Sequence, residues 1–133
     1  MARSRPAAGE KPLHWAGSSK KDLLGFPGLV ARQIGIALGV VQRGGHPPSA
    51  KPWKGLGPGV LEIVEDDAAG TYRAVYTVRF AKAIYVLHAF QKKSPSGIRT
   101  ARTDIRLIEE RLKAARNDYE ERHGKEADHH RSG

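Results

Sequence analysis

The chain has 133 residues, a formal net charge of +9 and no cysteine. A chain of this length supports one hydrophobic core, so we expect one domain. The lack of cysteine excludes a disulfide framework, a thiolate metal site and a thiol nucleophile. No apolar run reaches the roughly 18 residues that a membrane-spanning helix needs, and the first residues lack the apolar segment of a signal peptide. We therefore expect a soluble, cytoplasmic protein.

The first ten residues are small and polar, and we expect residues 1–10 to be disordered. The next segment, Lys11 to Ala16, alternates between apolar and polar residues, which is typical of a short edge strand. Leu13 and Trp15 then share one side of this strand. His14 lies on the other side, where we expect it to be exposed to solvent.

Two helices are expected after this strand. The first begins near Ser19 and is brief, because Gly25 and Pro27 interrupt it. Pro27 fits the first turn of the second helix, which the Gly44-Gly45 pair ends. The second helix carries one apolar stripe at helical spacing, made by Val30, Ile34, Ala37, Leu38 and Val41.

Residues 46–59 contain four prolines and three glycines, so we expect a loop there. The loop contains Lys51, Trp53 and Lys54, which bring two ammonium groups close to an aromatic ring. Such a stretch can hold a phosphate with lysine and stack a base on tryptophan. An alternative interpretation is that Trp53 closes one end of the core while both lysines face solvent.

Three strands follow the loop. Val60 to Val64 is the first, and residues 72–93 form a hairpin with a tight connection near Ala81 and Lys82. The run from Ile84 to Phe90 is apolar almost throughout, so we expect a central strand that is buried on both sides. The first hairpin strand has two faces: Tyr72, Ala74, Tyr76, Val78 and Phe80 on one, and Arg73, Val75, Thr77 and Arg79 on the other.

A last amphipathic helix is expected after Thr100, with an apolar stripe of Ile105, Ile108, Leu112, Ala115 and Tyr119. We therefore place the single domain at residues 11–122 and a flexible tail at residues 123–133. Neither a carboxylate nor a cysteine cluster accompanies His129 and His130, so no metal site is expected.

The positive charge is concentrated around the predicted sheet. No carboxylate occurs between Asp67 and Asp104, a stretch in which positive charges are frequent. A field of one sign attracts polyanions, which favours a nucleic-acid partner, although a basic surface that serves only solubility is an alternative. The cations of this stretch are Arg73, Arg79, Lys82, Lys92, Lys93, Arg99 and Arg102.

The expected order of elements is strand, two helices, three strands and helix. This order, together with the segments K-P-L-H-W, K-P-W-K-G-L-G-P-G-V-L-E-I, Y-R-A-V-Y and H-A-F-Q-K-K-S, resembles the RelE/ParE superfamily of bacterial and phage toxins, and within it the HigB-like, phage-derived branch. The resemblance covers residues 11–119. It implies an α+β fold in which helices wrap a small, largely antiparallel sheet.

The resemblance also implies a function. Such toxins usually cleave mRNA on the ribosome, without a cofactor, and are neutralised by a cognate antitoxin, often a helix-turn-helix protein. The matching positions are Lys54, Arg73, His88, Lys92 and Lys93.

The residue types suggest roles for these five positions. Arg73 suits the charge that gathers on the phosphate. Lys54 is either a base, if neighbouring cations depress its pKa, or a phosphate clamp. Lys92 or Lys93 can donate a proton to the leaving oxygen. His88 has an ordinary pKa near neutrality, but a hydrogen-bonded histidine inside a central strand is an equal alternative.

Further RNA contacts are expected from Lys51, Trp53, Arg79, Lys82 and Arg99. Two other functions stay open at this point. Relatives with this fold also poison DNA gyrase, and a degenerate toxin would bind RNA without cutting it.

Overall fold

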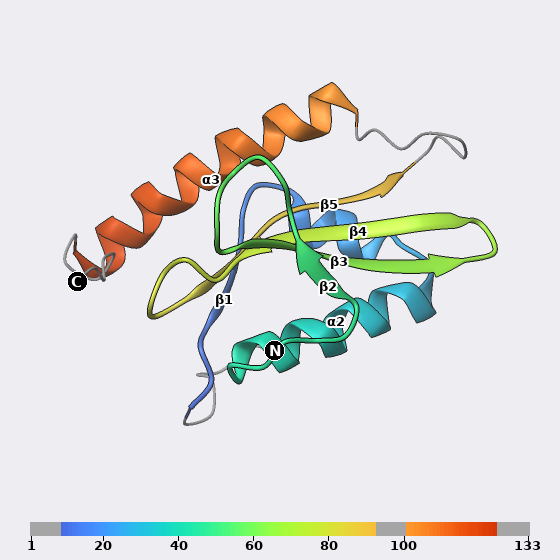
Figure 1. Cartoon of the computed structure of the whole chain (residues 1–133), viewed down its shortest axis with the longest axis horizontal. Coiled ribbons are helices and arrows are strands. Elements are labelled where there is room, and N and C mark those ends of the chain that lie inside the picture. Colours follow the sequence, from blue (N-terminus) through green and yellow to red (C-terminus); the bar gives the residue numbers. More distant parts are fainter. Residues whose placement is uncertain (1–8, 93–100, 125–133) are drawn as a thin grey trace.

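The computed structural model describes residues 9–92 and 101–124, which form a five-stranded sheet with helices on both of its faces (Figure 1). This confirms the expected α+β fold with two N-terminal helices and a C-terminal helix. In chain order the elements are β1 (Leu13–Trp15), α1 (Ser19–Leu24), α2 (Gly28–Gln42), β2 (Ala50–Pro52), β3 (Val60–Asp67), β4 (Gly70–Thr77), β5 (Ile84–Lys92) and α3 (Arg102–His123).

The strands lie in the order β1-β5-β4-β3-β2. Three neighbouring pairs are antiparallel, and only β1 runs parallel to its neighbour β5. A parallel pair needs a long crossover, which here consists of all the chain between β1 and β5. The sheet is therefore largely antiparallel, as expected, and β5 and β4 lie inside it.

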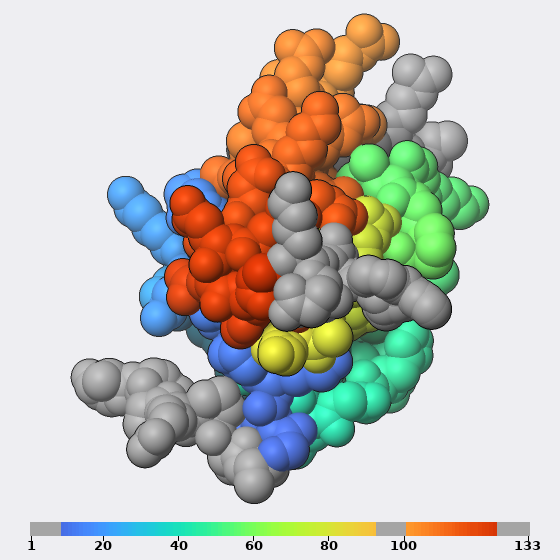
Figure 2. Space-filling view, turned by 90° about the vertical axis from the view of Figure 1, so that its left-hand side faces the viewer, coloured from blue at the N-terminus to red at the C-terminus, as the bar shows by residue number. Residues whose placement is uncertain are grey.

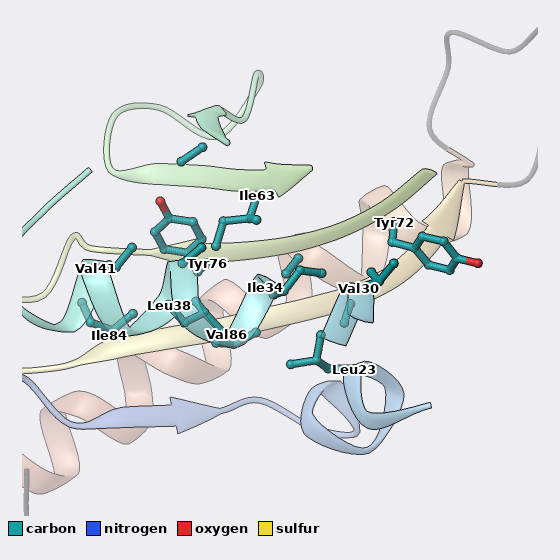
Figure 3. Packing of buried hydrophobic residues seen from close by; sticks show 14 residues of the cluster. Leu23, Val30, Ile34, Leu38, Val41, Ile63, Tyr72, Tyr76, Ile84 and Val86 are labelled. Atoms are coloured by element: carbon teal, nitrogen blue, oxygen red, sulfur yellow. The ribbon is translucent and has the colours of Figure 1, made fainter. Parts of the chain in front are cut away.

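One core cluster fills the space between the sheet and the two N-terminal helices (Figure 3). The predicted stripe of α2 is buried, and Ile34 has no exposed surface. It packs against alternate residues of the strands, because side chains of one strand alternate between the faces of a sheet. These strand residues are Ile63, Tyr72, Ala74, Tyr76, Ile84, Val86 and Ala89.

A second cluster lies between the other face of the sheet and α3. Tyr119 is fully buried there and stacks on Phe80, with ring centroids 4.8 Å apart. The Tyr119 hydroxyl accepts a hydrogen bond of 2.9 Å from the backbone N–H of Lys82, so α3 also holds the connection between β4 and β5. The predicted stripe of α3 faces this cluster, except that Ile105 is 37% exposed.

The predicted loop at residues 46–59 was partly wrong, because Ala50–Pro52 forms the short strand β2 and pairs with Leu61–Ile63 of β3. Proline lacks a backbone N–H, but an edge strand tolerates it where that position faces away from the ladder. The connection of the hairpin is also longer than predicted, since β4 ends at Thr77. Phe80 lies beyond this strand and joins the α3 side, opposite to Tyr76.

A bulge interrupts the pairing of β4 and β5. Val75 faces His88 while Tyr76 faces Val86, so Leu87 is an extra residue on β5. Leu87 lies in the α3-side cluster and His88 bonds to α3, so both neighbours face the same side. A bulge shifts the alternation by one residue.

Some predictions concern segments outside the described residues. Residues 1–8 and 125–133 are not among the described residues, so neither the disordered start nor most of the tail is tested. Within residues 9–92 and 101–124, no helix has the length and apolar character needed to cross a membrane.

The packing of α2 predicts different effects of two similar changes. Ile34 is fully buried, whereas Ile36 on the same helix is 57% exposed. Ile34→Ala is expected to lower the free energy of unfolding by about 2–5 kcal/mol, because it leaves a cavity. Ile36→Ala, the matched control, should change it by less than about 0.5 kcal/mol. Urea unfolding measures both, and equal losses would contradict this packing.

Candidate nucleic-acid interface

The strand register brings several predicted site residues to the face of the sheet that α3 covers. Lys51 is opposite Glu62, and Glu62 is opposite Val75, which shares its face with Arg73. His88 is opposite Val75, and Lys92 is opposite Thr71, which lies two residues before Arg73. Three strands, β2, β4 and β5, therefore contribute Lys51, Arg73, His88 and Lys92 to one face.

Arg73 is held in place by an ion pair. Its Nη1 lies 2.6 Å from Oε1 of Glu62, and the two side chains are 14% and 8% exposed. The Nε atom of Arg73 is buried and bonds to no other described residue. The guanidinium is thus fixed at one nitrogen and keeps donor capacity at another.

This ion pair corrects the expectation of a sheet face without carboxylates. The segment between Asp67 and Asp104 is free of acids, but β3 brings Glu62 beside Arg73, and α3 brings Asp104 beside His88. Burial of a charged or polar side chain costs free energy unless it is paired, so the fold brings these carboxylates from distant parts of the sequence to Arg73 and His88. The positive field on this face is therefore weaker than the local sequence predicts.

His88 is only 6% exposed and has partners at both ring nitrogens. Its Nε2 lies 2.7 Å from Oδ1 of Asp104, and its Nδ1 lies 3.4 Å from Nη1 of Arg111. Because arginine only donates, Nδ1 accepts and Nε2–H donates. The ring also stacks on Phe90, with centroids 4.8 Å apart. These contacts favour the interpretation of His88 as a hydrogen-bonded strand histidine that positions α3.

The remaining predicted residues lie elsewhere or are not described. Lys54 is exposed in the loop between β2 and β3, and Lys82 is exposed in the connection from β4 to β5. This end of β4, at Thr77, is about 13 Å along the strand from Arg73. Lys93 and Arg99 lie outside the described residues.

Arg79 and Trp53 have structural contacts at the same end of the sheet. Arg79 Nη2 donates to the carbonyls of Leu56 and Pro58 at 2.6 and 3.0 Å, which holds the loop between β2 and β3. Trp53 is 8% exposed and belongs to the α3-side core. This burial favours the alternative interpretation, in which Trp53 closes one end of the core.

A pocket of about 610 Å³ lies between β1 and α3, and no pattern in the sequence predicts it. Figure 2 shows this side of the molecule, where the orange-to-red α3 lies against the blue segment that contains β1. His14 lines the pocket with its ring 5.0 Å from that of Tyr85 and is half-buried, so the expectation of a solvent-exposed His14 was wrong. The reason is the parallel pairing of β1 with β5, which places His14 opposite Tyr85.

A polar network borders this pocket. The Tyr85 hydroxyl donates to Oδ2 of Asp118 at 2.5 Å, and Arg122 Nε donates to the same oxygen at 2.7 Å. The hydrogen bond from Tyr85, followed by that from Arg122, lowers the pKa of Asp118. Burial and the bond to Asp118 raise the pKa of Tyr85, while burial and Arg122 lower that of His14.

Across residues 9–92 and 101–124, histidine and carboxylate side chains form no group that could hold a metal ion.

The fold and this face define a small α+β protein of the RelE/ParE type that carries basic side chains on one side of its sheet. The profile of the family Phage derived protein Gp49-like (DUF891) matches residues 21–113, which is more than half of the chain. The chain therefore belongs to this Gp49-like family, a RelE/ParE-like toxin family of toxin–antitoxin systems. Neither a curated protein nor a solved structure matches the chain significantly.

The network at Asp118 predicts a pH-dependent contribution to stability. The pKa of the Asp118 carboxyl is lower in the folded than in the unfolded chain. The ionised carboxylate therefore stabilises the fold above about pH 4, and this stabilisation is lost as the pH falls below that value. Asp118→Asn should therefore reduce stability at pH 7, and the difference from wild type should shrink below pH 4. Because Asp118 is partly exposed, we expect a difference of less than about 1 kcal/mol. Urea unfolding at several pH values measures it, and a difference that grows on acidification would contradict the assignment.

Proposed function

We propose that this protein is the toxin of a type II toxin–antitoxin system, of the HigB-like branch, and that it is a ribosome-dependent mRNA endoribonuclease. The observation that carries the proposal is the placement of Arg73, fixed by Glu62, on the same sheet face as Lys51 and Lys92. Membership of a toxin family supports it. The antitoxin that this family suggests is proposed to be a helix-turn-helix protein.

The proposed reaction uses the 2′-hydroxyl of the RNA itself. Its oxygen attacks the neighbouring phosphorus, the bond from phosphorus to the 5′-oxygen breaks, and a 2′,3′-cyclic phosphate and a 5′-hydroxyl end result. One group must accept the proton of the 2′-hydroxyl, and another must protonate the leaving 5′-oxygen. Donors must also stabilise the negative charge on the phosphoryl oxygens.

Arg73 suits the last of these roles. Its guanidinium is permanently charged, and the ion pair with Glu62 orients it before RNA arrives, so little reorganisation is needed during the reaction. Lys92, on the neighbouring strand β5, and Lys51, on β2 beyond β3, share its face and would hold adjacent phosphates. For the proton transfers, Lys92 or Lys93 is the proposed acid, whereas Lys54, at the Thr77 end of the sheet, is proposed only as the clamp of a more distant phosphate.

A second candidate function is RNA binding without cleavage. The specific observation in its favour is His88, whose two ring nitrogens are both engaged by Asp104 and Arg111. His88 is therefore not free to exchange a proton with RNA. If the lysines also fail to transfer protons, the basic face binds RNA without cleaving it. Inhibition of gyrase is the third possible outcome of the experiment below.

Replacing the ion pair by two amides tests the role of Arg73. Removing Arg73 alone would leave Glu62 buried without a counter-charge and would destabilise the fold. The double variant Arg73→Gln, Glu62→Gln avoids this and leaves the net charge unchanged, so an effect cannot come from weaker long-range attraction. We expect cleavage to fall by about 10²–10³-fold, the size seen when one transition-state donor is lost.

The measurement combines growth arrest on controlled expression with mapping of 5′ ends in translated messages. Glu62→Gln alone is the control, because it keeps the guanidinium. Codon-positioned cuts that persist in the double variant at wild-type levels would contradict the role of Arg73. Growth arrest with intact messages and loss of plasmid supercoiling would instead support gyrase as the target. RNA binding that weakens steeply with salt, without arrest, would support the non-catalytic candidate.

A further inference from the structure

The outer face of α2 carries large apolar side chains in contact with solvent. Leu29 is 65% exposed and Ile36 is 57% exposed. They are seven residues apart, which places them on the same side of the helix two turns from each other. Arg32 lies between them in the sequence, one turn from each, and is also exposed. These three residues, Leu29, Arg32 and Ile36, are called the α2 outer face below.

The α2 outer face differs in chemistry from a solvated helix surface. Most exposed helices carry mixed charges opposite their apolar stripe. Here α2 contains no carboxylate, and its buried stripe and its outer face are both apolar, with a single charge at Arg32. Single exposed apolar residues are ordinary, but two large ones at this spacing form the pattern of anchors by which helices dock.

The backbone beside this face is open at Gly35, which points about 100° away from Ile36 around the helix. A Cβ atom added at Gly35 would have no heavy atom within 4 Å, so no other part of the described chain covers this turn. The neighbouring residue is Ile36. A partner helix can therefore approach the backbone here more closely than it could at a residue with a side chain.

The charge of Arg32 distinguishes three candidate binding partners of the α2 outer face: a second copy of the chain, RNA and a helix of another protein. A second copy of the chain, packed through the same face, would bring Arg32 against Arg32 without any carboxylate from either α2. Such a contact between like charges opposes association. For RNA, this face offers a single guanidinium, that of Arg32, between two apolar side chains, which is a poor match for a polyanion. A partner helix with apolar anchors and carboxylates beside them satisfies both features of the face.

We propose that the α2 outer face is the docking site of the antitoxin, which covers it with an amphipathic helix that carries carboxylates. The assignment rests on the proposed function, because that function implies the antitoxin. α2 packs on one side of the sheet, and α3 with the Arg73 face lies on the other (Figure 1). A helix docked on α2 therefore leaves Arg73 uncovered.

The lack of cysteine allows a direct test with one label per molecule. Ile36→Cys places a thiol on the α2 outer face, and Ile105→Cys, on α3, is the control because Ile105 is also an exposed apolar residue. Each variant is labelled with a fluorophore that responds to polarity and is titrated with the purified product of the adjacent reading frame. We expect a blue shift that saturates at one antitoxin per toxin for position 36, and no shift for position 105.

Two further variants test the chemistry of the face. Arg32→Glu should weaken the complex at least tenfold and remove much of its salt dependence, because it replaces attraction by repulsion. Gly35→Gln should block the close approach of a helix without a clash inside the toxin. Both positions are exposed, so we expect both variants to fold like the wild type. Circular dichroism and thermal unfolding check this.

The outcomes separate this inference from the proposed function. No shift at position 36, or a shift at position 105 alone, overturns the docking site. A shift at position 36 that depends on toxin concentration without antitoxin overturns it in favour of a second copy. The titration requires no toxic activity. A chain that binds through position 36 but cuts no message therefore refutes the nuclease, and a chain that cuts messages without a shift there refutes only the docking site.

Discussion

The burial of β5 on both faces is the constraint on which the rest of the structure depends. All residues from Ile84 to Phe90 are buried, with α1 and α2 on one side and α3 on the other. A polar group on such a strand must find a partner within the protein, because an unpaired buried group costs free energy. His88 is the residue concerned. Its partners, Asp104 and Arg111, both come from α3 and tie this helix to the sheet.

Arg111 extends this tie to the N-terminal helices. Its Nη1 donates to the carbonyl of Leu87 at 3.0 Å, and its Nη2 donates to Ser18 Oγ at 3.2 Å. The guanidinium passes so close to Gly17 that a Cβ there would lie 2.7 Å from Nη2, and Gly17 has a φ of +51°. Only glycine fits both requirements without strain. One arginine thus connects α3, the bulge of β5 and the start of α1.

The same burial divides the molecule into two surfaces with different chemistry. On the α3 side, Arg73 is oriented by Glu62 and shares its face with Lys92 of β5 and Lys51 of β2, which suits a polyanion. On the α2 side, exposed Leu29 and Ile36 suit an apolar partner. Because the sheet separates these surfaces, a message and a protein partner need not compete for the same residues.

The sequence alone determined the elements that depend on local periodicity. The stripe of α2, the stripe of α3 and the apolar run of β5 follow from spacings of three to four or two residues, and all three are found where they were expected, apart from the exposed Ile105 of α3. The α+β fold was predicted from the order of these elements and from the resemblance to toxins. The exception was β2, since the Pro-rich composition around Pro52 concealed an edge strand.

Only the tertiary structure decided which charges meet. Glu62 reaches Arg73 through strand pairing, and Asp104 reaches His88 through helix packing. Tyr85 meets His14 because β1 pairs in parallel with β5, and it meets Asp118 because α3 packs on the sheet. Such contacts join residues far apart in the chain, and no local pattern specifies them. Local spacing determines which way a side chain points along its own element, whereas its partner depends on how the elements pack.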